Sequence, residues 1–151
     1  MTPEEKLKEL GYELEHKTGG KVVLPGVITG NLLYLSGSTP GRDGKVWSGR
    51  VGETYTTEEG YQAAREVAVI QLEQAKSVLG ELGRIKRVVK VLGMVNCVPG
   101  FTETPQVMHG FSDLLFEIFG ENGRHARSAV GLQALPSNVP IEVETIFEIE
   151  P

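Results

Sequence analysis

Residues 127–149, RSAVGLQALPSNVPIEVETIFEI, decide the fold that we expect for this chain. Two runs of strand-forming residues, 127–133 and 141–149, flank a turn that contains Pro136-Ser137-Asn138. In the second run apolar residues alternate with glutamates, and neighbouring side chains of a strand point to opposite faces of a sheet. The alternation therefore predicts a sheet with one covered face and one open face.

Two long helices are predicted upstream of these strands. The sequence TTEE at residues 56–59 is typical of a helix start, and apolar residues then recur every three or four positions as far as Leu82. A second helix is expected to begin with Thr104 as its N-cap and Pro105 in its first turn, and to end at Phe119.

The remaining segments predict a short amino-terminal helix and three more strands. Thr2 and Glu5 form a capping box that begins the helix. Apolar runs at 21–24 and 31–37 are predicted strands, and 87–95 is apolar at both odd and even positions, as in a strand covered on both faces. The order β-β-α-β-α-β-β favours an α+β fold with the two main helices on one face of a mixed sheet.

The composition is that of one ordinary domain, which we expect to span residues 1–151. Fifteen basic and twenty acidic side chains give a formal net charge of −5, which argues against binding nucleic acid by neutralising phosphates. The single cysteine, Cys97, excludes a disulfide within the chain, and we expect a buried structural thiol. Without an apolar segment of membrane-spanning length or a signal-peptide pattern, a cytoplasmic location is expected.

The sequence motifs that bind nucleotides and metals are missing. The chain contains neither G-x-x-x-x-G-K-[ST] nor G-x-G-x-x-G. His16, His109 and His125 are not spaced as metal ligands. We therefore expect neither a metal nor an organic cofactor.

Small residues follow Arg127 on its own face of the predicted strand. Ala129 and Gly131 occupy the next two positions of the same parity, and we expect this face to be the one that the helices leave open. A positively charged side chain beside positions without large side chains forms a pocket for a small molecule when neighbouring chains enclose it.

Four short motifs stand out along the chain. They are Ser36-Gly37-Ser38-Thr39-Pro40, Ala126-Arg127-Ser128-Ala129-Val130, Leu135-Pro136 and Ile141-Glu142-Val143-Glu144. Together they resemble the RidA family, also called the YjgF or L-PSP endoribonuclease family, in a less characterised branch with RSAVG in place of RSCV. The resemblance covers residues 30–149. It implies a chorismate-mutase-like α+β fold and a homotrimer with three ligand sites in the clefts between subunits.

The resemblance implies roles for four residues. Arg127 matches the family arginine that holds a substrate carboxylate, and a guanidinium offers the planar fork that suits this group. Glu142 matches the glutamate that orients or activates a water molecule. Ser36 and the backbone amide of Ala129 match positions that line the same cleft.

Three positions depart from the family pattern. Ala129 stands where many members have cysteine, which excludes thiol chemistry at that position but keeps the amide. The family's amino-terminal tyrosine has no counterpart, because hydrophobic residues near Val22 and Val23 fall there. His109 replaces an asparagine of the second helix, and we include it among the substrate-binding residues.

Ordinary structural explanations stay open for each of these residues. Arg127 is also explained as a surface arginine at the start of a strand, and Glu142 as one of a row of solvated glutamates. His109 fits an exposed helix face. Ser36 fits a serine that satisfies backbone groups at a strand end.

Three functions are considered on these grounds. The first is hydrolysis of enamine or imine acids of the 2-aminoacrylate type to 2-oxo acids and ammonia, with Arg127 and Glu142 as catalytic residues. The second is a trimer that binds a small carboxylate without turnover. The third is RNA cleavage or translation inhibition. It is disfavoured because the net charge is negative, the basic cluster at 84–90 is small, and no two histidines are spaced for acid–base cleavage.

Overall fold

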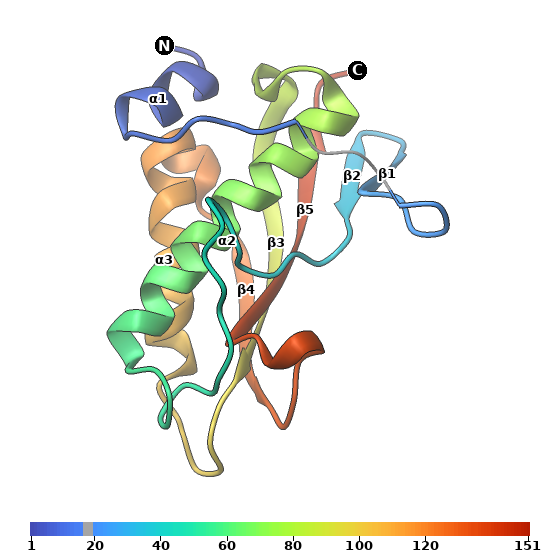
Figure 1. Ribbon diagram of the computed structural model, residues 1–151. Coiled ribbons are helices and arrows are strands. Elements are labelled where there is room, and N and C mark those ends of the chain that lie inside the picture. The colour runs from blue at the N-terminus through green and yellow to red at the C-terminus, as the bar shows by residue number, and fades with distance from the viewer. Residues whose placement is uncertain (17–19) are drawn as a thin grey trace.

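The framework of the computed structural model, which describes residues 1–16 and 20–151, is one five-stranded sheet. The strands are β1 (Gly26–Thr29), β2 (Leu32–Leu35), β3 (Ile85–Asn96), β4 (Ala126–Leu132) and β5 (Ile141–Ile149). The helices are α1 (Pro3–Glu9), α2 (Thr57–Leu79) and α3 (Thr104–Phe119), with short 3-10 turns at Leu82–Arg84, Gly120–Gly123 and Pro136–Asn138 (Figure 1). Across the sheet the order is β1-β2-β5-β3-β4, so that β4 forms one edge.

The sheet is mixed, as the sequence predicts. β3 runs parallel to β4 and antiparallel to β5, whereas β2 is antiparallel to both β1 and β5. Parallel neighbours need a crossover, and α3 provides the one between β3 and β4. The predicted α+β class and element order are confirmed.

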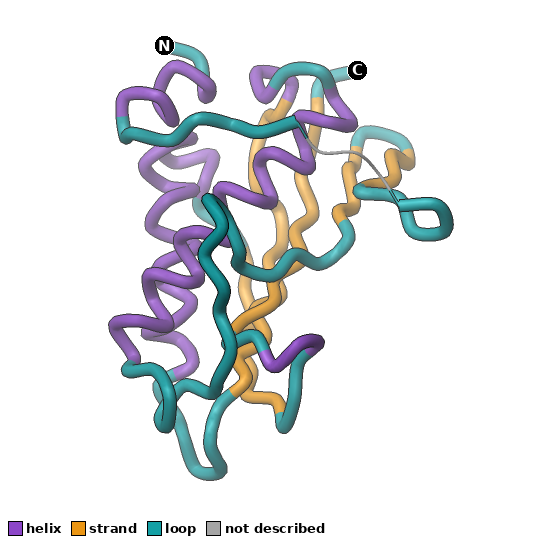
Figure 2. The backbone as a smooth tube through the Cα atoms, viewed as in Figure 1, coloured by secondary structure: helices purple, strands orange, loops and turns teal. Residues whose placement is uncertain are grey.

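Helices α2 and α3 lie side by side on one face of the sheet (Figures 1 and 2). The side chains of β5 on that face are buried, namely Ile141, Val143, Thr145, Phe147 and Ile149. The alternate side chains of β5, from Glu142 to Glu148, lie on the face away from α2 and α3. The prediction of one covered and one open face is confirmed. No helix of the described chain has the length and apolar character that crossing a membrane requires.

The predicted helix starts hold at two of three positions. The capping box of Thr2 and Glu5 is present, and Thr56 forms a second one with Glu59. The third differs, because the cap of α3 is Glu103 and Thr104 is already helical. The hydroxyl of Thr104 donates instead to the backbone carbonyl of Ala129 in β4, at 3.0 Å. A residue predicted to cap a helix thus ties α3 to the edge of the sheet.

The first strand begins later than predicted. Residues 21–24 form no strand, and Val22 and Val23 are 91% and 65% exposed. Strand β1 starts only at Gly26, where a Cβ would lie 2.9 Å from the Leu35 side chain. Glycine at this position leaves room for the Leu33 and Leu35 side chains of β2, and the apolar character of 21–24 is a misleading signal.

Side chains of α2 order the long glycine-rich loop between β2 and α2. The carboxylate of Glu66 accepts hydrogen bonds from the backbone amides of Gly41 and Arg42 and from the indole of Trp47, at 2.8–3.2 Å. Arg42 is buried and forms an ion pair with Glu73 at 3.3 Å. The loop is therefore a fixed part of the surface.

Gly110 of α3 lies directly against the backbone of α2, and Gly110→Ala is expected to destabilise the fold. An added Cβ would overlap the carbonyl oxygen of Tyr61 on α2. Overpacking of this kind costs up to about 3 kcal/mol, more than the roughly 1 kcal/mol that alanine gains over glycine within a helix. Urea unfolding followed by circular dichroism measures the difference.

Gly83→Ala is the matched control for this substitution, because no atom of residues 1–16 and 20–151 lies within 4 Å of a Cβ at that position. Its effect should stay within about 0.5 kcal/mol. Equal stability of Gly110→Ala and the wild type would contradict the close approach of the two helices.

Candidate functional site

The pairing of β4 with β3 turns Arg127, Ala129 and Gly131 toward the helices. Ala129 lies opposite Gly93, and a Cβ at Gly93 would overlap the Met108 side chain of α3. The expectation that these residues occupy the open face is therefore wrong. The direction of an edge strand's side chains depends on its register with the partner strand, which the alternation within β4 does not reveal.

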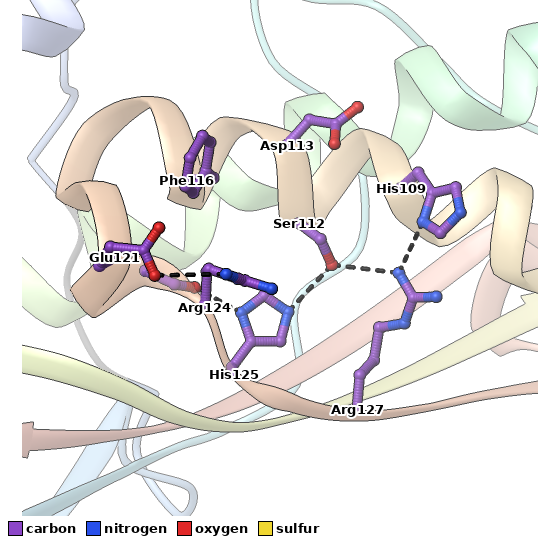
Figure 3. A pocket seen from close by; sticks show the side chains of 9 residues that line it. His109, Ser112, Asp113, Phe116, Glu121, Arg124, His125 and Arg127 are labelled. Carbon is purple, nitrogen blue, oxygen red and sulfur yellow. Dashed lines mark hydrogen bonds and ion pairs between the residues drawn. The ribbon is translucent and has the colours of Figure 1, made fainter.

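Arg127 enters a pocket between α3 and the segment that leads into β4 (Figure 3). The pocket has a volume of about 640 Å³, which is within the range of small-molecule sites. One wall is a single face of α3, with His109, Ser112, Asp113 and Phe116 at helical spacing. The other wall comprises Glu121, Gly123, Arg124, His125 and Arg127.

Neutral side chains of α3 hold the guanidinium of Arg127. Its Nη1 donates to Nδ1 of His109 and to Oγ of Ser112, each at 3.1 Å (Figure 3). Arginine can only donate, so Nδ1 of His109 accepts and the ring is neutral, with its hydrogen on Nε2.

His125 extends this network with a defined polarity. Its Nδ1 lies 2.7 Å from the carbonyl oxygen of Gly123, which can only accept, so Nδ1 carries a hydrogen. Burial lowers the pKa of His125, opposed by this hydrogen bond, and favours the neutral ring. Nε2 then accepts from the hydroxyl of Ser112 at 2.9 Å. Hydrogen bonds therefore run from Arg127 through Ser112 to His125.

The positive charge of Arg127 has no close counter-charge in the described chain. No carboxylate of these residues lies within 4.0 Å of its guanidinium. Burial lowers the pKa of Arg127, and the charge of Asp113 opposes this effect, but a guanidinium stays protonated. Asp113 itself accepts from the hydroxyl of Tyr61 at 2.6 Å, which raises the pKa of Tyr61 to about 12. Arg127 is thus an oriented cation able to bind an anion.

Glu142 lies on the other face of the sheet, against the segment that follows β2. It pairs with Met94, one register position away from the pair of Gly93 and Val143 that faces the helices. Its carboxylate packs on Gly37, where a Cβ would lie 2.5 Å from Oε2. Burial raises the pKa of Glu142, and the charge of Glu144 adds to this effect. Glycine at position 37 therefore makes room for a half-buried carboxylate.

Ser36 lies next to this second group. Its hydroxyl donates its hydrogen to the carbonyl of Leu24 at 2.6 Å. This bond agrees with the ordinary explanation of Ser36, a serine that satisfies a backbone group at a strand end. Its own carbonyl accepts from Gln71 and Gln74 of α2. The hydroxyl oxygen still has acceptor capacity for a ligand.

The predicted site residues therefore form two groups on opposite faces of one sheet. Arg127 contacts His109 on the side of α3, where Ala129 also lies without lining their pocket, whereas Glu142 lies on the open side against Gly37, the neighbour of Ser36. A single chain does not bring Arg127 and Glu142 into one pocket.

Sequence reasoning missed Ser112 and His125. The signals were present, because Ser112 lies three residues after His109 on a predicted helix and His125 lies two residues before Arg127. The histidines that look scattered in the sequence include two that share this pocket. Within residues 1–16 and 20–151, no three His, Cys, Asp or Glu side chains are grouped to hold a metal ion.

The geometry can be set beside known proteins. A model of the family described as "YjgF/chorismate mutase-like, putative endoribonuclease" matches residues 5–148. The chain belongs to this family. The YjgF-family chain is 43% identical over 125 residues to the protein TCP17 of Trypanosoma cruzi, which covers 82% of this chain and 78% of that protein. The resemblance to RidA proteins is confirmed at the level of the family.

Two solved structures are similar to this chain over almost their whole length. Protein Atu1372 of Agrobacterium tumefaciens, of unknown function, is 42% identical, with a TM-score of 0.90 over 98% of this chain and 92% of that one. A Shewanella oneidensis protein described as a "putative endoribonuclease" is 37% identical, with a TM-score of 0.92 over 99% of this chain and 100% of that one. The chorismate-mutase-like fold of the YjgF family is thus confirmed.

The neutral state of His125 predicts a loss of stability as the pH falls below about 6.5. Folding lowers the pKa of His125 from 6.5, so the unfolded chain takes up the proton first. The contribution of His125 to the free energy of unfolding is complete above the pKa that this histidine has in the unfolded chain. It is lost as the pH falls toward the pKa of His125 in the folded chain. Urea unfolding between about pH 8 and pH 5 should show a shallower decline for His125→Gln than for the wild type.

His16→Gln is the control for this pH series, because His16 is exposed and lies outside the Arg127 pocket. It should keep the wild-type slope. Identical slopes for the wild type and His125→Gln would show that the pocket does not hold this histidine neutral.

Proposed function

We propose that this chain hydrolyses small 2-imino acids, and the enamines that give rise to them, to 2-oxo acids and ammonia. The observation that carries the proposal is the guanidinium of Arg127, a cation held by neutral partners in a pocket of small-molecule size. Its planar fork suits the carboxylate that all these substrates share. The reaction implied by the resemblance to RidA proteins agrees with this chemistry.

The proposal includes a homotrimer whose clefts join two half-sites. Arg127 and His109 of one chain supply the first, and Glu142 and Ser36 of a neighbour supply the second. Strand β4 lies at the edge of the sheet, so a neighbouring chain can approach Arg127 from its free side. Such a contact joins two different surfaces, and it closes into a ring when the rotation between chains is threefold.

In the proposed reaction, water adds to the imine carbon, a proton moves from the added oxygen to the nitrogen, and the carbon–nitrogen bond breaks. Ammonia leaves and the carbon keeps the oxygen as an oxo group. Arg127 fixes the carboxylate of the substrate. Glu142 accepts a proton from the attacking water and returns it to the departing nitrogen. The raised pKa of Glu142 suits both steps, because burial makes its protonated form accessible closer to neutral pH.

Arg127→Ala is expected to lower kcat/KM for 2-aminoacrylate by about 100-fold, because two charge-assisted hydrogen bonds to the substrate are lost. A dehydratase generates 2-aminoacrylate, and pyruvate formation above the uncatalysed rate measures the activity. Arg87→Ala is the control, since this exposed arginine lies outside the pocket, and it should retain the wild-type rate. Equal rates for Arg127→Ala and the wild type would refute the proposed role.

Mixing two inactive variants tests the shared cleft. Arg127→Ala and Glu142→Gln lack different half-sites, so every mixed trimer contains one cleft with both wild-type residues. Random assembly of equal amounts should restore about a quarter of the wild-type activity. Light scattering should give a mass near three times 16.4 kDa.

The control for this experiment mixes Arg127→Ala with the double variant Arg127→Ala/Glu142→Gln, which contains no wild-type Arg127 and should stay inactive. If the first mixture also stays inactive although trimers exchange subunits, the two half-sites do not meet between chains.

Binding without turnover is a second candidate, and the separation of Glu142 from Arg127 within one chain favours it. Arg127-dependent binding of 2-oxobutyrate in calorimetry, without any acceleration of pyruvate formation, would select this function.

Phosphodiester cleavage is the third function considered, and it would use His109 and His125, which share the Arg127 pocket. It needs one histidine as a protonated acid, whereas burial lowers the pKa of His125 and His109 accepts from arginine. We therefore expect purified protein to leave RNA intact. RNA cleavage that disappears in His109→Ala would overturn this expectation.

A further inference from the structure

A second cavity lies at the opposite end of β4 from Arg127. Its volume is about 560 Å³, again in the range of small-molecule sites. It lies where the loop before α2, the segment after β3 and the end of β4 converge. Its lining includes Arg50, Cys97, Val98, Phe101, Gly131 and Leu132, and it shares no lining residue with the Arg127 pocket.

Gly131 keeps this second cavity open, and Thr104 packs near Gly131. A Cβ at Gly131 would lie 2.8 Å from Sγ of Cys97 and 3.8 Å from Cγ2 of Thr104. The hydroxyl of Thr104 is bonded to the carbonyl of Ala129, which lies midway along β4 between Arg127 and Gly131. Arg127 and Gly131 are four residues apart on one strand, a distance of about 13 Å.

Arg50 gives the cavity an oriented positive charge. Its Nη2 donates to the backbone carbonyl of Gln133 at 3.1 Å, and its own carbonyl accepts from the amides of Thr54 and Tyr55 at 3.0 Å. Among the residues described, no carboxylate lies within 4.0 Å of the half-buried guanidinium. Most of its five N–H donors therefore remain available to an anion.

The other walls of this cavity are mainly apolar, unlike those of the Arg127 pocket. Val98, Phe101 and Leu132 are half-buried and line it. One cation balances one negative charge, and apolar walls favour a ligand that buries carbon atoms. A monocarboxylate with an apolar or aromatic body meets both conditions, whereas acetate, with a single methyl group, meets only the first.

We propose that the cavity of Arg50, Phe101 and Gly131 is a second ligand site, independent of Arg127, that binds a small monocarboxylate with an apolar body. The carboxylate lies on Arg50, and the apolar body contacts Phe101, Val98 and Leu132. This site is separate from the proposed hydrolysis, and no residue of that reaction belongs to it.

Calorimetry with benzoate on the Arg127→Ala protein tests the proposal, because this variant removes the first carboxylate site. We expect one benzoate per chain. Adding Arg50→Gln should weaken binding at least about tenfold, while the glutamine amide can still donate to Gln133. Adding Lys45→Gln, which removes an exposed charge from the same loop, should change the affinity less than about twofold. Acetate should bind at least about tenfold more weakly than benzoate.

Cys97 reports where benzoate binds, because it is the only thiol of the chain and lines the cavity. Burial raises the pKa of Cys97, so alkylation by iodoacetamide is measured at mildly alkaline pH by mass spectrometry. Benzoate should slow alkylation in the wild type and in Arg127→Ala, but not in Arg50→Gln.

The proposal is overturned if Arg127→Ala alone abolishes benzoate binding, or if Arg50→Gln binds benzoate as tightly as its parent. Arg50→Gln should also retain the wild-type rate with 2-aminoacrylate. A protein that does not hydrolyse 2-aminoacrylate but binds benzoate through Arg50 would refute the proposed reaction and leave this second site intact.

Discussion

The parallel pairing of β4 with β3 is the constraint on which the candidate site depends. It sets Arg127 opposite Val91 and Ala129 opposite Gly93, two positions that face the helices. A shift of one residue would turn Arg127 to the open face and away from α3, because side chains alternate along a strand. The hydrogen bond from Thr104 to Ala129 holds α3 at the distance that lets its side chains reach Arg127. The direction of one arginine therefore follows from the register of a whole strand.

Hydrogen-bond polarity then determines what this arginine can do. His109 and Ser112 orient the guanidinium as acceptors without neutralising its charge. A carboxylate at the same distance would hold the Arg127 side chain equally well, but it would neutralise the positive charge that an anionic ligand needs. Arg50 is held in a similar way, by the carbonyl of Gln133. Both cations are fixed by neutral groups, and this shared feature makes each cavity suitable for an anion.

The sequence predicted most of the fold because its signals are local. Capping boxes at Thr2 and Thr56 and the alternation in β5 depend on neighbours a few residues away, and all three are present. The predictions that differ depend on distant partners. Thr104 bonds to β4 instead of capping its helix, and the apolar run at 21–24 forms no strand. Local spacing relates Ser112 to His109 and His125 to Arg127, but only the packing of α3 against β4 brings these residues together.

By itself, the sequence determined the α+β class, the order of the elements and the family. Periodicity, helix caps and short motifs can each be recognised within a short segment of the chain. Only the tertiary structure decided which face Arg127 occupies and that Glu142 lies on the other face of the sheet. The physical reason is that strand register and helix packing arise from contacts between segments far apart in the chain. The same contacts form one cavity at Arg127 and another at Gly131, each lined by segments that are far apart in the sequence.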